Sequence, residues 1–323
     1  MKEIKFLHKN IKKWKHFESL LENNKDWDPD RLFELYISLT DDLAYAKSYY
    51  PESESYAYLN QLTRKVHAII YRNKPMEKKR IISFWGKEFP LLFRSIQKEF
   101  LISLFIFILA ILIGILSTRY EPSFAKTILG DKYINMTMRN IHENDPMAVY
   151  KQMNEVQMFL GITLNNIRVS FLAFVFGIFT AFGTGFVLFS NGVMLGTFHA
   201  FLAQQGVVVE AFASLWLHGT IEIFSIIVAG AAGIHIGNSF IFPGTYKRSH
   251  ALQKAALKSA RIVLGLVPFF IIAGFIEGFI TRHTEMSYAV RFTIIACSLA
   301  FIVYYFFIYP KLLIKKNLNH GSK

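Results

Sequence analysis

The sequence predicts an all-α, polytopic membrane bundle of five to six transmembrane helices, preceded by a cytoplasmic helical domain. Of the 323 residues, 53% are apolar and only 18% are charged, and the apolar residues gather in long runs after about residue 100. A soluble domain usually has about 25% charged residues. The profile therefore argues against an ordinary soluble enzyme and against a disordered chain.

The net charge of +13 has two interpretations. In a soluble protein it would suggest nucleic acid. Here the basic residues flank the apolar runs, as the orientation of membrane proteins requires. We therefore expect the lipid bilayer as a partner and no nucleic acid.

Residues 1–79 are predicted to form the cytoplasmic helical head. Phe6, Trp14 and Phe17 belong to apolar positions repeated at three- and four-residue steps, which indicate one face of a helix. Segments that contain proline separate this helix from two more. Residues 80–100 mix aromatic and basic side chains, which predicts an interfacial amphipathic helix in the headgroup layer.

The transmembrane bundle is expected at residues 101–310, with an outer loop at 119–168 and a basic cytoplasmic tail at 311–323. About 20 apolar residues cross a hydrocarbon core of about 30 Å. Asn191-Gly192 is typical of a turn, so the third span is expected to be short or re-entrant. The predicted spans are residues 101–118, 169–189, 193–205, 210–236, 262–281 and 291–309.

Charge predicts the orientation of the bundle. Residues 237–261 hold five bases and no acid, and basic segments stay in the cytoplasm. Because the head and the tail are basic too, both termini are predicted to be cytoplasmic. That arrangement favours six crossings, with five as the alternative. The five bases are also expected to contact anionic lipid at the membrane surface: Lys247, Arg248, Lys254, Lys258 and Arg261.

Three ionisable residues stand out inside the predicted spans, where each such group costs several kcal/mol. His218 and Glu222 are four positions apart and share a helix face, and Glu277 belongs to the next long span. We expect a buried polar cluster, with His199 and His235 as additional candidates. The cluster could lock the bundle together, relay protons or ions during transport, or form a metal or catalytic centre.

No catalytic residue, metal site or cofactor is expected. A His-Glu-x-x-His run could bind zinc, and a nucleophile elbow or a phosphate loop would indicate an enzyme or a nucleotide site. None of these motifs occurs in the sequence.

Several short strings together resemble the stage II sporulation protein M family. They are His218-Gly219-Thr220-Ile221-Glu222, Ala229-Gly230-Ala231-Ala232-Gly233, the Asn191-Gly192 pair and the segment 273–281. The resemblance implies a multi-pass protein of the bacterial inner membrane. It also implies a non-enzymatic scaffold or assembly component of a cell-envelope complex, with peptidoglycan-remodelling membrane proteins as partners.

Two other functions remain open from the residues themselves. A transporter or channel-like component would use His218, Glu222 and Glu277 for ion or proton coupling. A metal-dependent intramembrane hydrolase is the third alternative. A homo-oligomer also remains open, because small residues four apart, such as Gly233 and Gly237, let helices approach closely.

Overall fold

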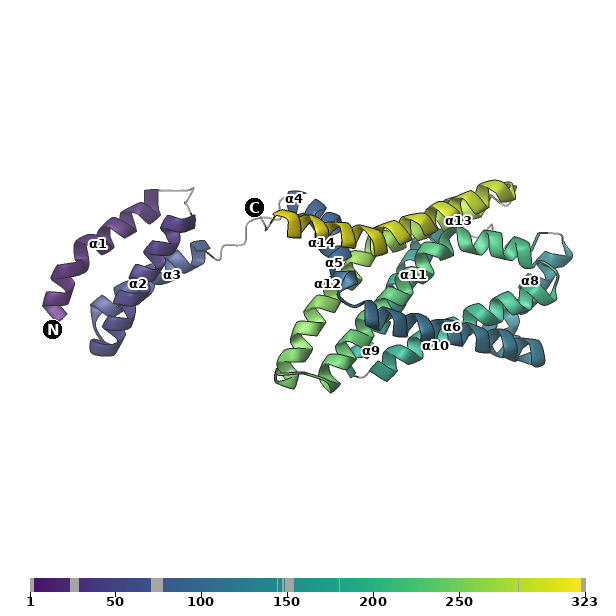
Figure 1. Ribbon diagram of the computed structural model, residues 1–323, viewed down its shortest axis with the longest axis horizontal. Helices are drawn as coiled ribbons and strands as arrows, with labels where there is room; N and C mark the ends of the chain where they lie inside the picture. Colours follow the sequence, from purple (N-terminus) through teal and green to yellow (C-terminus); the bar gives the residue numbers. More distant parts are fainter. Residues whose placement is uncertain are drawn as a thin grey trace. The chain divides into compact units, whose positions relative to one another are not determined.

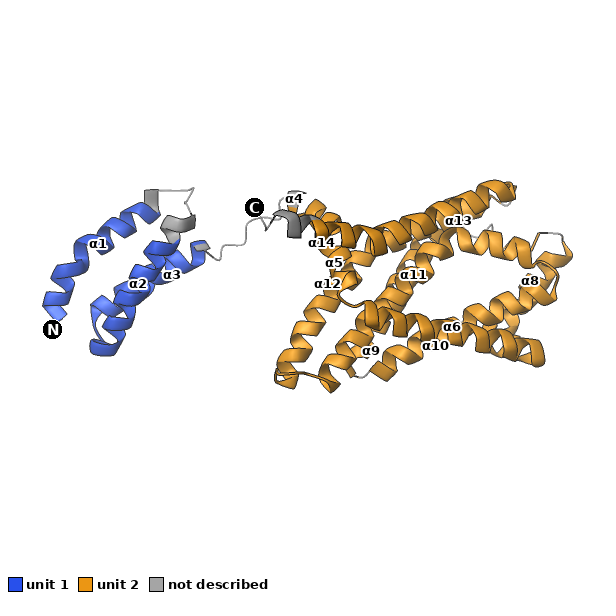
Figure 2. Cartoon of the chain, in the orientation of Figure 1, with its two compact units in different colours: residues 1–78 blue, residues 79–323 orange. Residues whose placement is uncertain are grey.

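The computed structural model confirms the all-α prediction, because its described residues form helices and no strand (Figure 1). It describes residues 3–23, 29–70, 78–143, 145–146, 148, 154–179, 181–283 and 285–320. The last three residues of the predicted tail, and parts of the predicted outer loop, lie outside this range. Two compact units divide the chain, Met1–Lys78 and Lys79–Lys323 (Figure 2).

The first unit contains three helices, α1 (Glu3–Asn23), α2 (Pro29–Tyr49) and α3 (Glu54–Ile70). Their apolar faces meet around Trp14, which is fully buried. The indole Nε1 of Trp14 donates a hydrogen bond to Asp42 Oδ2 on α2, at 2.8 Å. The first unit therefore has a hydrophobic core of its own.

The second unit holds six helices that are long and apolar enough to cross a membrane, by length and composition, within the described residues. Large apolar side chains such as Phe182 and Phe186 lie exposed on its surface, as lipid contact requires and as a soluble protein rarely allows. Its elements are α4 (Lys78–Ser83), η1 (Phe84–Glu88), α5 (Phe89–Arg94), α6 (Gln97–Tyr120), α7 (Ser123–Leu129), α8 (Asp131–His142), α9 (Glu155–Phe179), α10 (Ala181–Gln204), α11 (Val208–Ile241), α12 (Arg248–Phe275), η3 (Ile276–Thr281), α13 (Tyr288–Ile302), η4 (Val303–Ile308) and α14 (Tyr309–His320).

The predicted turn at Asn191-Gly192 and the short third span at 193–205 are wrong. Residues 181–204 form one uninterrupted helix, α10. Asn191 Nδ2 donates to Val187 O of the same helix at 2.8 Å, so its amide is satisfied without a turn. Gly192 lies against Phe107 and Ala110 of α6, where the missing side chain permits close helix packing.

The predicted second span at 169–189 is wrong as well. The helix that crosses there, α9, runs from Glu155 to Phe179. The segment between α6 and α9 is consequently shorter than the outer loop predicted at 119–168, and it contains the short helices α7 and α8. The basic segment that begins at Lys247 is not a separate loop helix, because α12 starts at Arg248 and continues directly into the apolar part of the span.

Residues 80–100 differ from the single interfacial helix that the sequence predicts. They form α4, η1 and α5 in succession and then enter α6. Phe89 and Phe93 of α5 are fully buried in the core of the bundle. Trp85 Nε1 donates to Gly265 O on α12 at 3.1 Å. The aromatic residues of this segment therefore pack it into the bundle.

Helix α11 lies at the centre of the second unit. In its most apolar stretch 78% of the residues are buried, against 17% in the span that begins at Tyr288. A helix that is apolar on all sides is expected in such a central position. Its glycines Gly230, Gly233 and Gly237 lie against α10, and Gly233 also touches the backbone of α9. We call these close contacts the glycine seam.

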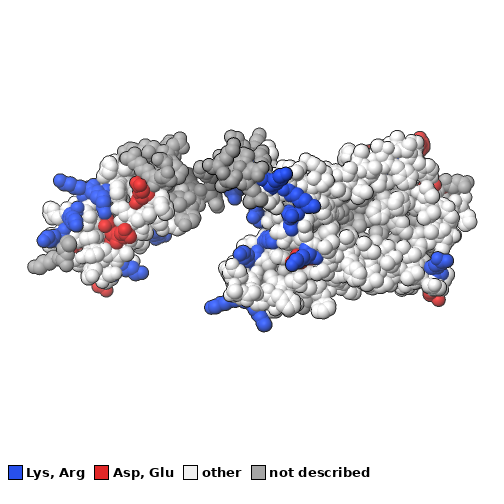
Figure 3. Space-filling model, in the orientation of Figure 1, with Lys and Arg blue, Asp and Glu red and all other residues white. Residues whose placement is uncertain are grey.

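Basic side chains gather at the end of the second unit where α12 begins, and the body of the unit carries few charges on the visible face (Figure 3). Arg261 pairs there with Glu88 of η1. Lys254 lies 5.0 Å from the ring centroid of Tyr246. Of the five predicted surface bases, Lys247, Arg248, Lys254 and Arg261 are exposed and Lys258 is half-buried. Their predicted lipid contact stays a prediction.

Candidate functional site

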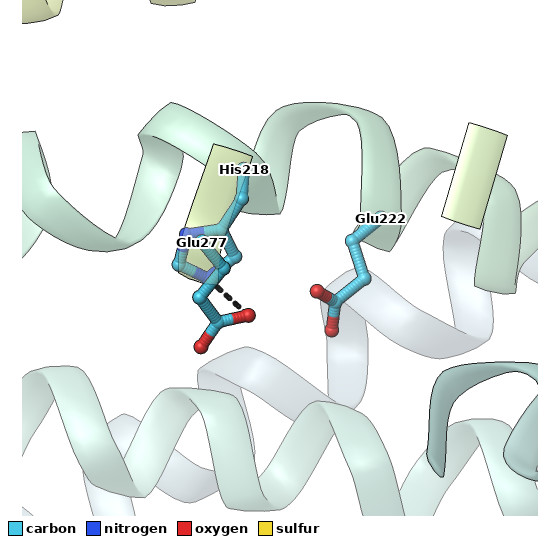
Figure 4. Close-up of side chains that lie close together, drawn as sticks. All are labelled: His218, Glu222 and Glu277. Carbon is cyan, nitrogen blue, oxygen red and sulfur yellow. Dashed lines mark ion pairs between the residues drawn. The ribbon is translucent and has the colours of Figure 1, made fainter. Parts of the chain in front are cut away.

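The structure brings together the three residues for which the sequence predicts a shared cluster. His218 and Glu222 project from α11, and Glu277 reaches them from η3 (Figure 4). His218 Nε2 and Glu277 Oε2 are 3.3 Å apart. One nitrogen or oxygen atom from each of the three side chains lies within 4.8 Å of the others. We call this group the His/Glu cluster.

A π-helical turn positions Glu277. The η3 segment Ile276–Thr281 interrupts the regular α-helix directly after Phe275, and such π-bulges occur frequently at functional sites. Glu277 and Thr281, four positions apart in this turn, both contact His218. Gly278 packs against the α9 backbone at Glu155 and Phe159, which holds the turn close to its neighbour.

The hydroxyl of Thr281 favours one tautomer of His218. The Thr281 hydroxyl donates to Ile276 O at 3.3 Å. The same Oγ1 lies 3.2 Å from His218 Nδ1, so it accepts the proton of Nδ1. In a neutral imidazole the other nitrogen is then an acceptor. The lone pair of Nε2 consequently faces the carboxylate of Glu277.

Glu222 has an oxygen atom without a partner. Its Oε2 is buried and makes no hydrogen bond within the described residues. Asn166 of α9 interacts with this carboxylate, but Asn166 Nδ2 is also buried and lacks a hydrogen bond of normal geometry. Because unpaired buried polar groups are costly, two such atoms side by side indicate a place for water or a ligand.

A cavity of about 380 Å³ reaches the cluster. His218, Gly219 and Glu222 line it from α11. The volume lies within the range of small-molecule pockets, about 300 to 1,000 Å³. Polar side chains from three other helices also line it: Tyr133 of α8, Asn165 and Asn166 of α9, and Asn191 of α10.

His199 and His235, the additional candidates, do not join the cluster. His199 lies 2.9 Å by Nδ1 from Leu195 O, and its Nε2 accepts from Trp216 Nε1 at 3.1 Å. Nδ1 therefore bonds within α10, and Nε2 links α10 to α11. His235 pairs by Nδ1 with Glu99 Oε1 of α6 at 3.1 Å. It therefore belongs to a second, separate His–Glu pair.

Sequence reasoning missed three polar residues around the cluster. Thr281 and Asn166 contact it directly. Arg291 of α13 is 97% buried, and its Nη1 donates to Ser214 Oγ at 3.0 Å. Ser214 lies one helical turn before His218 on α11. The pair Asn165-Asn166, next to the apolar segment that begins at Val169, was the available signal. The misplaced start of the second span assigned this pair to a loop.

Comparisons with known proteins agree with the sequence resemblance. The model of the family described as Stage II sporulation protein M matches residues 103–282, more than half of the chain. That segment runs from α6 to the residue after η3 and contains all three cluster residues. A second model, described as a domain of unknown function (DUF8413), matches residues 4–72 in the first unit. No curated protein and no solved structure matches the chain.

Proposed function

We propose, given that the chain belongs to the stage II sporulation protein M family and is a multi-pass membrane protein, that it binds a small polar solute or cation in its cavity and acts as a transporter or channel-like component. The cavity of about 380 Å³ that reaches His218 and Glu222 carries this proposal. Ionisable residues inside membrane spans commonly mark substrate or ion pathways.

The state of the cluster favours transport over a locked structural contact. A structural cluster would satisfy its polar atoms internally. Here Glu222 Oε2 and Asn166 Nδ2 both lack a hydrogen bond of normal geometry, and both residues line the cavity. A cavity of this volume holds on the order of ten water molecules, at about 30 Å³ each. In the proposed function Glu222 and His218 receive the solute, and Glu277 balances charge behind them.

Thiol labelling tests whether the cavity is open to water. Gly219 lines the cavity, and a Cβ added there would meet only Ile223 and Leu215 of its own helix, at 3.5 Å or more. Gly219→Cys, made in a Cys297→Ser background, should react in native membranes with a charged, membrane-impermeant thiol reagent. Ala229→Cys is the matched control, because Ala229 is fully buried on the same helix and should stay unlabelled.

Protection from both sides of the membrane at Gly219→Cys would refute the transport proposal, provided that the variant folds. Folding is verified by size-exclusion chromatography and by helical circular dichroism. Glu222→Gln then separates binding from folding. It should keep the native elution position and abolish the cellular activity of the protein, whereas a structural role predicts loss of the folded protein.

The second candidate function is the scaffold of a cell-envelope complex. The first unit supports this function. It has its own core around Trp14 and its own family match, and a transporter would not need such an additional domain to form the cavity. The expected partners are peptidoglycan-remodelling membrane proteins. Crosslinking in native membranes should recover such a partner with the full chain and lose it when residues 1–78 are deleted.

For its location we propose the bacterial inner membrane with both termini in the cytoplasm. Six candidate spans place the termini on one side, and the basic residues at the start of α12 favour the cytoplasmic side. Cysteine tags inserted at Gly130 and Gly244, two turn glycines with positive φ, test the orientation. Only the tag at Gly130 should react from outside. A tag at Gly244 that reacts from outside would overturn the proposed orientation.

A further inference from the structure

We propose that His218, Glu222 and Glu277 together bind one divalent transition-metal ion of the zinc type, with an open coordination position toward the cavity. The inference builds on the proposed function, because the cavity is the route by which the ion and its further ligand would arrive. A bound cation of this class would explain why two carboxylates and an imidazole lie so close together in a buried place.

The spacing of the ligand atoms suits such an ion. Zinc binds imidazole nitrogen and carboxylate oxygen at about 2.0 to 2.2 Å with tetrahedral geometry, which places neighbouring ligand atoms about 3.4 Å apart. His218 Nε2 and Glu277 Oε2 are already 3.3 Å apart. The third ligand atom, from Glu222, lies within 4.8 Å of both. A shift of at most about 1.4 Å in the Glu222 side chain, which has three rotatable bonds, brings its oxygen to that spacing.

The orientation of the His218 imidazole also suits a bound metal ion. Thr281 accepts the proton of His218 Nδ1, so the lone pair of Nε2 points at the Glu277 carboxylate. Nε2 of His218 and Oε2 of Glu277, 3.3 Å apart, are held together either by a proton carried on one of the two atoms or by a metal ion between them. A hydrogen bond from the remote ring nitrogen is also the usual support of a metal-bound histidine.

The charge of the cluster favours the metal ion over the proton. Glu222 and Glu277 bring two carboxylates to one buried place, and such a pair is costly without compensation. Arg282, the residue that follows η3, pairs with Glu155 at 3.0 Å and so is engaged with a different carboxylate. A proton on Nε2 would balance one carboxylate. A divalent ion balances both, and it also gives Glu222 Oε2 the partner that it lacks.

The ligand types select the metal class. Calcium and magnesium prefer six or more oxygen ligands, whereas imidazole with carboxylates suits zinc and its neighbours. Three protein ligands leave a fourth position for water or solute, as in zinc sites that are not purely structural. Asn166 Nδ2, buried and unpartnered beside the cavity, is available to donate to that further ligand.

Metal analysis of the full-length protein purified in detergent tests the proposal. Elemental mass spectrometry should find about one zinc, iron or manganese ion per chain. Glu222→Gln and Glu277→Gln should each reduce this content at least tenfold while keeping the native elution volume. Glu99→Gln is the matched control, because Glu99 also pairs with a histidine of α11 but lacks a second carboxylate. It should retain the metal.

Cobalt titration of the wild-type protein, after removal of metal by a chelator, keeps the test independent of variant folding. Saturable visible absorption bands at one cobalt per chain are expected, and added zinc should displace them. A wild-type protein that contains no metal and takes up neither cobalt nor zinc would overturn the proposal. A Glu99→Gln variant that loses metal as completely as Glu277→Gln would overturn it too.

The metal proposal and the transport proposal fail in different ways. Labelling at Gly219→Cys without stoichiometric metal refutes the metal site and leaves the cavity function standing. Stoichiometric metal together with a fully protected Gly219→Cys refutes the transport function and leaves a structural metal site.

Discussion

Two glycines of α11 should respond in opposite ways to the same substitution. Gly219 lines the cavity, and Gly233 lies in the glycine seam. In either place alanine is the better helix former, by about 1 kcal/mol in a helix interior. The difference between the two variants therefore reports the space around each Cβ.

At Gly219 the gain in helix propensity is not opposed. The added Cβ would lie 3.5 Å from Ile223 and 3.9 Å from Leu215, which are ordinary contact distances. At Gly233 it would overlap Ala173 O of α9 and lie 2.5 Å from Thr184 Oγ1 of α10. Neither neighbour can easily move, because Thr184 Oγ1 donates to that same Ala173 O at 2.7 Å.

The expected magnitudes follow from these distances. Gly219→Ala should raise the free energy of unfolding by up to about 1 kcal/mol. Overpacking of a tight interior costs about 1 to 3 kcal/mol, and the backbone clash at Gly233 belongs at the upper end of that range. After the gain in helix propensity, Gly233→Ala should be about 1 to 2 kcal/mol less stable than the wild type.

Equilibrium unfolding in mixed detergent micelles, followed by helical circular dichroism, measures both values. Both variants carry the same Gly→Ala substitution on α11, so each serves as the control for the gain in helix propensity in the other. A Gly233→Ala protein as stable as Gly219→Ala would show that α9, α10 and α11 do not pack as closely as the structure describes.

Three further predictions concern contacts away from the cavity. Trp14→Phe should lower the stability of the first unit by about 1 to 2 kcal/mol, because the hydrogen bond to Asp42 is lost with part of the buried ring; unchanged protease resistance of residues 1–78 in the full chain would contradict this. Ser103→Ala removes a buried 2.7 Å hydrogen bond to a carbonyl of α11 and should cost about 0.6 kcal/mol, with an upper bound near 1.7, in the same unfolding assay. Trp216→Phe removes the donor to His199 and should cost about 1 kcal/mol without changing thiol access at Gly219→Cys; a change there would place His199 in the cavity after all.

The sequence predicted the cluster because its evidence is local and strong. His218 and Glu222 are four positions apart on one helix face, and an ionisable residue in a long apolar run needs a partner. Glu277 was the remaining ionisable group in the next long span. The all-helical fold followed from equally simple evidence, since runs of about 20 apolar residues have few alternatives in lipid.

The limits of α9 and α10 could not be read in the same way. Residues 169–189 contain no charged residue, so composition does not mark where α9 ends and α10 begins. Asn191-Gly192 predicts a turn in water, where the backbone can leave the helix and be hydrated. Inside the bundle Asn191 donates to its own helix and Gly192 fits against α6. Tertiary packing therefore overrides the local signal.

The position of the cluster along α11 constrains any transport mechanism. His218 and His235 are 17 positions apart, about 25 Å along the helix, and the glycine seam at Gly230, Gly233 and Gly237 lies at the His235 end. The cavity that reaches His218 is lined by residues of α7 and α8, so it belongs to the other end. At Gly233 and Gly237 the seam is closed by backbone contacts, which no rotamer change can open. A solute that enters beside His218 can consequently leave past His235 only if α9 and α10 separate from α11 as whole helices, which is the rigid-body motion that alternating access requires.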